Sequence, residues 1–297
     1  MNGSTLPPSP TQPTAIRDAI AWAARQFSPL LTDTPRLDAE LLLAHSLGWH
    51  RARLHAYPEQ TLSPEQMAVF GDLSHRHAQG EPLAYLLEQQ EFFGLSFYVD
   101  NRVLIPRPET ELLVEEAIAW LQTRQIDCRH LIVADVGTGS GVVAISLATS
   151  CPRLTLYATD VSADALQVAA RNTQHHAVAS RIRLLHGDLL APLPEPVHLI
   201  AANLPYVSED ELAYLPPHIV RFEPRLALDG GADGLSVVER LLSQAMSYLL
   251  PQGVILIEIG AAQGDLALAR ARHFFPSAQI QVRQDHGARD RLMIIET

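Results

Sequence analysis

The sequence has few of the features that mark secreted, membrane-bound or disulfide-rich proteins. It contains two cysteines, Cys128 and Cys151, which are too few for a disulfide framework and suit a reducing compartment. No apolar run reaches the ~18 residues that a membrane span needs, and the N-terminus lacks the basic-then-apolar layout of a signal peptide. We therefore expect a cytoplasmic protein that does not bind membranes.

Metal-binding motifs and an excess of basic residues are also missing. Neither His-Glu-x-x-His nor Cys-x-x-Cys occurs. The pairs His75/His77 and His175/His176 suit solvated helix positions better than a metal site, because they lack ligand spacing. The 22 Lys and Arg against 33 Asp and Glu give a net charge of −11. That balance argues against a broad basic field that holds a nucleic-acid backbone, although it leaves room for a local basic patch.

The sequence does contain enough apolar residues, 47% of 297, to bury a large core. Residues 1–14, rich in Pro, Ser and Thr, predict a flexible tail. Residues 15–88 show helical apolar spacing and predict an all-helical domain. Residues 89–106 hold two β-prone runs separated by the turn formers Asp100-Asn101, which predicts a β-hairpin connector. One apolar stripe, Ile16, Ile20, Ala23, Ala24 and Phe27, predicts the first helix, and the next two helices are expected to begin at Thr34-Pro35 and Ser63-Pro64-Glu65.

Residues 107–297 alternate short apolar runs with helical patterns, which is typical of an α/β domain with a mostly parallel sheet. In such sheets ligands bind beyond the carboxyl ends of the strands. The expected strands are 131–136, 154–159, 181–186, 198–202, 253–259, 279–284 and 292–296. The expected helices are 109–121, 142–149, 163–176, 235–249 and 263–274.

Three of the expected strands end in residues that suit an adenosine-containing cofactor. The first is followed by Gly137-Thr138-Gly139-Ser140-Gly141, whose glycines permit a tight turn and a close approach of the backbone to a ligand. Asp160 ends the next strand, 160 − 137 = 23 positions on, where a carboxylate can accept hydrogen bonds from ribose hydroxyls. Asp188 ends the strand after that. Taken singly, the turn could be a plain turn, and Asp160 could be a helix N-cap.

The fourth strand ends in Asn203-Leu204-Pro205-Tyr206, and this turn suggests a reaction. The nitrogen of a planar amide or aromatic amine is a poor nucleophile, because its lone pair is delocalised. A site can accept both of its N–H bonds, one at the Asn203 side-chain oxygen and one at the Leu204 carbonyl, while Tyr206 stacks on the planar group. Such positioning supplies several kcal/mol, up to ~7–11, of a methyl-transfer barrier. The alternative is an ordinary proline turn with a packed tyrosine.

Together these residues resemble a class I S-adenosylmethionine-dependent methyltransferase, with a Rossmann-like sheet and an amino-methylating motif of the Asn-Pro-Pro-Tyr type. Flanking phrases, among them LIPRPETE, RFEPRLALDGG and HGARDRLMI, narrow the resemblance to the PrmC/HemK family, from about residue 15 onward. That resemblance implies methylation of the side-chain amide nitrogen of the glutamine in the Gly-Gly-Gln loop of class I peptide chain release factors. S-adenosylmethionine would be the methyl donor and S-adenosylhomocysteine the product.

The resemblance also assigns roles to residues. Gly137 to Gly141 would cradle the methionine part of the cofactor, Asp160 its ribose, and Asp188 and Leu189 its adenine. Asn203 would contact both cofactor and substrate, and Asn203 to Tyr206 would form the glutamine pocket. The helical domain would recognise another surface of the release factor. We expect a monomer with no metal and no direct nucleic-acid contact.

Two residues depart from the family pattern. Leu204 stands where proline is usual, but it keeps its backbone carbonyl and, before Pro205, its bias toward extended geometry. Leu189 replaces an aromatic residue found in some relatives, and a branched aliphatic side chain can still cover an adenine face. We expect the function to survive both changes. Arg107, Glu109 and Glu111 fit a structural role better than a functional one, and for residues 289–291 a binding role and a solvated charge cluster are equal alternatives.

Three other functions stay open at this point. A glutamine methyltransferase of a ribosomal protein would use identical chemistry, but the PRPETE and RFEP phrases favour release factors. The Asn-Leu-Pro-Tyr spelling also occurs in RNA adenine dimethyltransferases, so an adenine N6-methyltransferase would fit if the site lay in a basic groove. A non-catalytic cofactor-binding protein would need the glycine turn but not the amide clamp of Asn203 and Tyr206.

Overall fold

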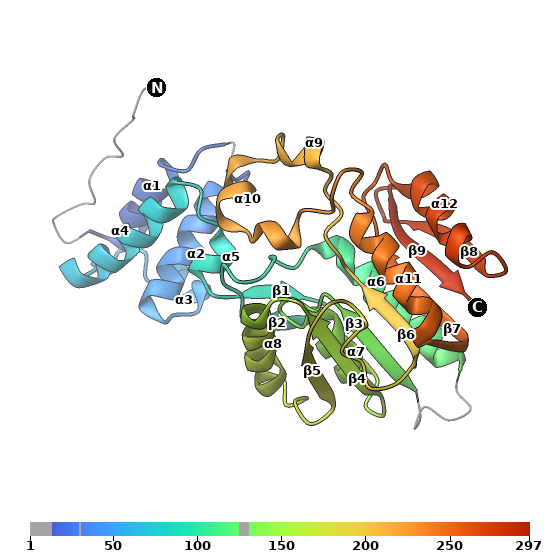
Figure 1. The fold of residues 1–297 in the computed structure, drawn as a ribbon. Coiled ribbons are helices and arrows are strands. Elements are labelled where there is room, and N and C mark those ends of the chain that lie inside the picture. The colour runs from blue at the N-terminus through green and yellow to red at the C-terminus, as the bar shows by residue number, and fades with distance from the viewer. Residues whose placement is uncertain (1–13, 30, 125–130) are drawn as a thin grey trace. The chain divides into compact units, whose positions relative to one another are not determined.

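A computed structural model describes residues 14–29, 31–124 and 131–297. The expected flexible tail, apart from Thr14, and Cys128 lie outside these residues. The chain divides into two compact units. One comprises Met1–Gln89 and Pro216–Phe222, and the other comprises Gln90–Leu215 and Glu223–Thr297 (Figure 1).

The first unit is helical in its described residues. Its helices are α1 (Ile16–Ala24), α2 (Pro35–Leu47), α3 (Arg51–Ala56), α4 (Pro64–Ala78), α5 (Leu83–Leu86) and α10 (Pro217–Phe222). α4 begins where the sequence predicts, because Ser63 and Gln66 form a capping box that satisfies free backbone donors of the first turn. α2 ends at Gly48, which adopts the left-handed conformation that glycine tolerates best. Phe70, Leu42 and other apolar side chains form the core of this unit.

A short antiparallel hairpin opens the second unit. β1 (Gln90–Phe92) pairs with β2 (Leu95–Phe97), and the turn between them is Phe93-Gly94. Both turn residues have positive φ, 51° and 70°, as in the tight turns that match the twist of paired strands. The predicted turn at Asp100-Asn101 is therefore wrong. The Asp100 carboxylate instead accepts the Arg102 backbone N–H, which makes a local turn without strands on both sides.

The second unit is built on a mixed sheet. Within the described residues the strand order is β5-β4-β3-β6-β7-β9-β8. The first five of these strands run parallel, and β9 is antiparallel to both β7 and β8. The strands are β3 (Ile132–Val136), β4 (Thr155–Asp160), β5 (Ile182–His186), β6 (Val197–Ala202), β7 (Leu249–Glu258), β8 (Gln279–Gln284) and β9 (Asp290–Glu296).

Helices cover both faces of this sheet, and the sequence predicts most of them. They are α6 (Glu111–Thr123) after the 3-10 turn η1 (Pro108–Thr110), α7 (Val142–Ser150), α8 (Ala163–His175), α11 (Ser236–Tyr248) and α12 (Gly264–Phe274). The elements α9 (Glu209–Leu212) and η2 (Arg225–Ala227) are too short to show apolar periodicity, although Ser208 and Glu211 form a capping box at the start of α9. None of the helices in the described ranges has the length and apolar character that crossing a bilayer requires.

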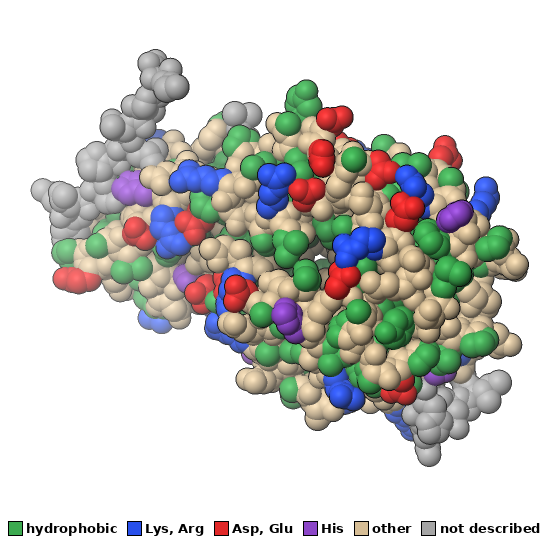
Figure 2. All heavy atoms as spheres, in the orientation of Figure 1, with side chains coloured by type: hydrophobic (Ala, Val, Ile, Leu, Met, Phe, Trp, Pro, Cys, Tyr) green, Lys and Arg blue, Asp and Glu red, His purple; other side chains and the backbone are tan. Residues whose placement is uncertain are grey.

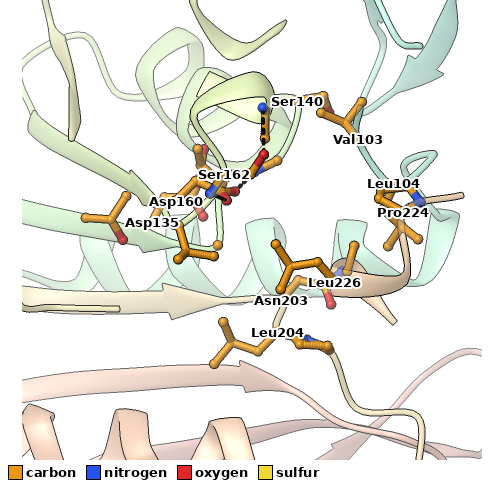
Figure 3. A pocket seen from close by; sticks show the side chains of 18 of the residues that line it. Val103, Leu104, Asp135, Ser140, Asp160, Ser162, Asn203, Leu204, Pro224 and Leu226 are labelled. Atoms are coloured by element: carbon orange, nitrogen blue, oxygen red, sulfur yellow. Dashed lines mark hydrogen bonds between the residues drawn. The ribbon is translucent and has the colours of Figure 1, made fainter. Parts of the chain in front are cut away.

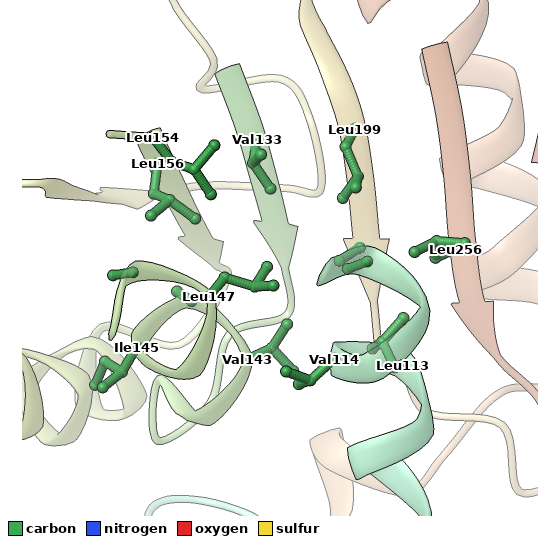
Figure 4. Packing of buried hydrophobic residues seen from close by; sticks show 14 of the residues in the cluster. Leu113, Val114, Val133, Val143, Ile145, Leu147, Leu154, Leu156, Leu199 and Leu256 are labelled. Atoms are coloured by element: carbon green, nitrogen blue, oxygen red, sulfur yellow. The ribbon is translucent and has the colours of Figure 1, made fainter. Parts of the chain in front are cut away.

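Alternation along the strands places the core on both sides of the sheet. Val133 and Leu199 point to the face covered by α6 and α7, where they pack with Leu113 and Leu147 (Figure 4). Their neighbours along the same strands, Ala134 and Ile200, point to the opposite face, where α11 and α12 contribute Val238, Leu241 and Ala267. A sheet buried on both faces reads as continuous apolar runs, which is why the sequence shows its strands so clearly.

The strand order fixes where a ligand can bind. From β3 the chain moves outward to β4 and β5, and it then returns to the other side of β3 to form β6. The loops that follow β3 and β6 therefore leave neighbouring strands in opposite directions. A crevice opens between such loops at the carboxyl edge of the sheet.

Asn172 on α8 ties the segment after the hairpin to the loop after β3. Its side chain is fully buried. Its Oδ1 accepts the Tyr98 backbone N–H at 2.8 Å, and its Nδ2 donates to the carbonyl oxygens of Tyr98 at 2.9 Å and Ser140 at 2.8 Å. One side chain thus satisfies three buried backbone groups.

Replacing Asn172 with alanine should lower the free energy of unfolding by about 3 kcal/mol, because buried backbone groups lose their partners at ~1–3 kcal/mol each. Urea denaturation measures this. The exposed Gln174 on the same helix provides the control, and Gln174→Ala should change stability by less than about 0.5 kcal/mol. Equal stabilities of the two variants would contradict the role of Asn172.

Candidate active site

A pocket of about 400 Å³ lies at the carboxyl ends of β3, β4 and β6. This volume falls within the ~300–1,000 Å³ typical of small-molecule sites. Ten of the twelve residues predicted from the sequence line it: Gly137, Thr138, Gly139, Ser140, Asp160, Asp188, Leu189, Asn203, Leu204 and Pro205. Gly141 and Tyr206 are not among the lining residues.

The loop after β3 lies against the turn after β6. Gly137 has a φ of +73°, and a Cβ atom there would come within 3.0 Å of Leu204 Cδ2 and 3.4 Å of the Asn203 carbonyl oxygen. Only glycine fits this position without displacing its neighbours. The backbone N–H groups of Gly137 and Thr138 both donate to the Thr159 carbonyl at 2.9 Å, which holds the loop to the end of β4.

Gly141, the last residue of the glycine loop, contacts helices and not the pocket. It is the N-cap of α7 in the left-handed conformation, and a Cβ atom there would approach Ile145 Cδ1 to 3.0 Å and Ala169 Cβ to 3.4 Å. Its missing side chain lets α7 pack closely against α8. Gly141 therefore shapes the loop from behind the pocket.

The Asp160 carboxylate holds the glycine loop from the pocket side. Its Oδ2 accepts the Gly139 backbone N–H at 2.9 Å, and its Oδ1 accepts the Ser162 N–H at 2.8 Å. Burial raises the pKa of Asp160, while these backbone donors and His186 lower it. Each carboxylate oxygen can accept more than one hydrogen bond, so both oxygens keep capacity for a ligand hydroxyl. Figure 3 shows Asp160 beside Ser162 on one side of the pocket.

Asp188 already has partners within the protein. Arg240 Nη2 donates to its Oδ2 at 2.5 Å, and Gln244 Nε2 reaches the same oxygen at 3.4 Å. Leu189 follows with a φ of +51°, an uncommon conformation for a branched residue, and its side chain is buried. Arg240 lines the pocket too. Sequence reasoning missed it, because no motif links α11 to the loop after β5.

Asn203 lies on the loop after β6 with its two polar atoms in different surroundings. Its Nδ2 donates to Thr110 Oγ1 at 2.9 Å. Among the residues that the structure describes, no donor is bonded to Asn203 Oδ1 or to the Leu204 carbonyl oxygen. Both oxygens thus keep lone pairs that no described protein donor uses. Figure 3 shows Asn203 and Leu204 next to each other at the pocket.

Tyr206 is held from two sides. Its hydroxyl donates to Glu258 Oε1 at 3.3 Å, and its carbonyl accepts from Gln263 Nε2 at 2.8 Å. Burial and the charge of Glu258 raise the pKa of Tyr206, so the phenol stays protonated near neutral pH. The predicted stacking of Tyr206 on a substrate amide stays a prediction.

A further wall of the pocket comes from segments that the sequence analysis did not assign to it. Val103, Leu104, Pro224 and Leu226 lie across from Asp160 (Figure 3). These segments are tied together by Glu223, a buried residue that accepts hydrogen bonds from the Arg107 side chain and, at 3.2 Å, from the Ile105 N–H. The phrases PRPETE and RFEP therefore meet at the pocket.

The remaining charged residues singled out from the sequence lie elsewhere. Glu111 Oε1 accepts the Phe93 backbone N–H at 2.8 Å, which anchors the hairpin turn to α6. Arg291 pairs with Asp285 at 3.3 Å. Neither Glu109 nor any of residues 289–291 lines the pocket. Across the described ranges, no cluster of three or more His, Cys, Asp and Glu side chains could hold a metal ion.

Asp135, near the end of β3, holds the glycine loop that follows this strand. The sequence analysis did not single it out. Its Oδ2 accepts a hydrogen bond from the Thr138 hydroxyl at 2.6 Å and another from the Ala144 N–H at 3.1 Å. Burial raises its pKa from 3.8 to about 6, and the nearby Asp160 charge adds to this, although the two hydrogen bonds act in the opposite direction. The folded state therefore holds this proton more tightly than the unfolded state does.

Asp135 should make the protein less stable as pH rises. Because its folded pKa lies above the unfolded value, the free energy of unfolding falls between pH 4 and pH 6. Asp135→Asn can keep both hydrogen bonds through its single carbonyl oxygen and has no charge. Relative to this variant, the original protein should lose about 2 kcal/mol between pH 4 and pH 7, because most of the pKa difference at ~1.4 kcal/mol per unit falls in that range. Denaturant titrations at both pH values measure the difference, and a pH-independent difference would refute the assignment.

Two family models match the chain. Residues 18–87 match the PrmC N-terminal domain, and residues 110–217 match the methyltransferase small domain. Among solved structures, a methyltransferase from Pyrococcus furiosus aligns with 76% of this chain and 98% of its own length, with a TM-score of 0.51 and 16% identity. This similarity, together with the sheet order, shows the class I methyltransferase fold.

Curated relatives match over almost the whole length. A release factor glutamine methyltransferase from Moorella thermoacetica is 41% identical over 94% of this chain and 97% of its own. One from Bordetella pertussis is 42% identical over 86% of this chain and 91% of its own. At this identity and coverage, the chain belongs to the release factor glutamine methyltransferase family.

Proposed function

We propose that this protein transfers a methyl group from S-adenosylmethionine to the side-chain amide nitrogen (N5) of the glutamine in the Gly-Gly-Gln loop of class I peptide chain release factors. The observation that carries the proposal is the pair of available oxygens, Asn203 Oδ1 and the Leu204 carbonyl, beside the pocket that the glycine loop lines. The names of the relatives support the choice of substrate.

The residues of the pocket fit this cofactor. Gly137 and Gly139 line the pocket and have no side chains, so a ligand can approach the backbone of this loop closely. The Asp160 oxygens can accept ribose hydroxyls in addition to their two backbone donors. Leu189 can cover the adenine, and Asp188, held by Arg240, can lie at its edge. When bound, S-adenosylmethionine supplies a methyl group already activated by its positively charged sulfur.

Asn203 and Leu204 would hold the substrate carboxamide by its two N–H groups. This contact fixes the plane of the amide and turns one face of its nitrogen toward the pocket, which lowers the entropic part of the barrier. The two carbonyl oxygens also stabilise the positive charge that builds on the nitrogen as the C–N bond forms. The nitrogen would gain the methyl group as the S–CH₃ bond breaks and its electron pair stays on the sulfur of S-adenosylhomocysteine, and the nitrogen would then lose one proton. An alkylated amide nitrogen is strongly acidic, so water can take that proton.

The surface of the molecule suits a protein substrate. The net charge is −11, and on the face drawn in Figure 2 the arginine side chains lie among acidic ones without a continuous basic area. A nucleic-acid substrate would be held chiefly through its phosphates, which need concentrated positive charge. We assign recognition of a second surface of the release factor to the helical unit, and we place the reaction in the cytoplasm, carried out by a monomer.

The direct test is incubation with methyl-labelled S-adenosylmethionine and a purified class I release factor. Label should appear on the glutamine of the Gly-Gly-Gln loop, as located by mass spectrometry of the digested product. A release factor with alanine at that glutamine is the matched control and should stay unlabelled. Label on ribosomal protein or on RNA, with the release factor untouched, would overturn the proposal.

Asn203→Ala should impair catalysis without impairing cofactor binding. Because Asn203 Oδ1 orients the amide, kcat should fall by about 100-fold or more, whereas the cofactor dissociation constant should change by less than about 3-fold. Steady-state kinetics and calorimetry measure the two quantities. Asn101→Ala, at an exposed turn outside the pocket, is the control and should leave both unchanged. Lost cofactor binding with a normal rate per bound cofactor would show that the role of Asn203 is wrong.

A further inference from the structure

Behind Asn203 lies a line of hydrogen-bonded side chains from three separate segments. Asn203 Nδ2 donates to Thr110 Oγ1 at 2.9 Å, and Thr110 Oγ1 donates to Glu258 Oε2 at 2.6 Å. The Tyr206 hydroxyl donates to the other carboxylate oxygen at 3.3 Å. Thr110 is 2% exposed and Glu258 is 1% exposed. Thr110 ends η1 and is the N-cap of α6, and Glu258 ends β7, so neither belongs to the motif that contains Asn203.

The chemistry of these groups allows only one direction of hydrogen bonding when Glu258 is ionised. A carboxylate accepts and cannot donate, and a hydroxyl has a single hydrogen. The hydrogen of Thr110 is used on Glu258, so Thr110 Oγ1 offers only lone pairs to Asn203. Asn203 must therefore present its NH₂ group to Thr110. Its carbonyl oxygen is then directed away from Thr110.

This direction matters because the two ends of an asparagine amide have nearly the same shape. A flip exchanges an acceptor for a donor without a change in packing, and only the surrounding hydrogen bonds distinguish the two states. In the flipped state the Asn203 NH₂ group would face the NH₂ group of the substrate. The substrate would lose one of its two acceptors and meet a partial charge of the same sign.

We propose that Thr110 and Glu258 are positioning residues that set the direction of the Asn203 amide and thereby keep its oxygen facing the substrate nitrogen. The inference rests on the proposed methyl transfer to a carboxamide. Thr110 and Glu258 act through Asn203, and Tyr206 holds the second oxygen of Glu258, which fixes the plane of the carboxylate.

The groups around Glu258 shift its pKa in both directions. Burial and the negative charge of Glu109 raise its pKa, while Arg291 and the hydrogen bonds from Thr110 and Tyr206 lower it. A protonated Glu258 could donate to Thr110, whose own hydrogen would then be free to turn toward Asn203. The order of donors would be reversed and the amide would flip. Ionised Glu258 is thus the form that supports the reaction.

The test compares variants in the methylation of a release factor. Thr110→Val keeps the shape but removes the hydroxyl, and kcat should fall by about 10- to 100-fold with little change in cofactor affinity. Thr110→Ser restores the hydroxyl and should recover most of the rate. Thr123→Val, an exposed position near the end of α6, is the matched control and should leave the rate unchanged.

Glu258→Gln and a double-variant series separate positioning from stability. Glu258→Gln removes a buried charge but can donate to Thr110, so it should lower kcat while the melting temperature stays equal or rises. In an Asn203→Ala background, Thr110→Val and Glu258→Gln should have no further effect on kcat, because the residue they act through is gone.

Two different failures can be told apart. If the original protein does not label the release factor at all, the proposed function is wrong. If the original protein labels it and Thr110→Val labels it at the same rate, the positioning role is wrong. Full additivity of Thr110→Val with Asn203→Ala would also overturn it, since that result would show an action independent of Asn203.

Discussion

The site depends on the contact between the loop after β3 and the turn after β6. The strand order makes β3 and β6 neighbours while their loops lead to opposite sides, so Gly137 and Leu204 meet at the crevice. A Cβ atom at Gly137 would press against the Leu204 side chain, and the φ of +73° disfavours any residue other than glycine, so glycine allows the two segments to lie this close. In the proposed reaction, the loop after β3 would bind the methyl donor and the turn after β6 would bind the acceptor.

Buried carboxylates orient the polar groups of this site, and burying them lowers the free energy of unfolding. Asp135 supports the glycine loop and Glu258 supports Thr110, and burial raises the pKa of both. A charged group removed from water is tolerated only when it is hydrogen-bonded, and each of these accepts two hydrogen bonds. Neutral residues of the same size would be more stable there. The two carboxylates can only accept hydrogen bonds, so they determine which of the neighbouring polar groups donate.

The sequence predicts the sheet and the two halves of the pocket, but not the interactions that orient them. Apolar runs locate the strands because both faces are buried, and glycine and asparagine stand out because turns after strands need them. The pair Thr110 and Glu258 is separated by 148 residues, and nothing local marks it. The hairpin turn was misplaced because Phe93-Gly94 is a weaker turn signal than Asp100-Asn101. Helix α9 has four residues, too few for apolar periodicity to show, and its local signal is the capping box of Ser208 and Glu211.

We propose that two oxygens from one turn hold a carboxamide against the methyl donor, and a crystal structure with S-adenosylhomocysteine and a peptide containing Gly-Gly-Gln tests this. The glutamine nitrogen should lie within hydrogen-bond distance of both Asn203 Oδ1 and the Leu204 carbonyl oxygen, with Asn203 Nδ2 still bonded to Thr110. A glutamine bound elsewhere, or one that faces the Asn203 NH₂ group, would contradict it.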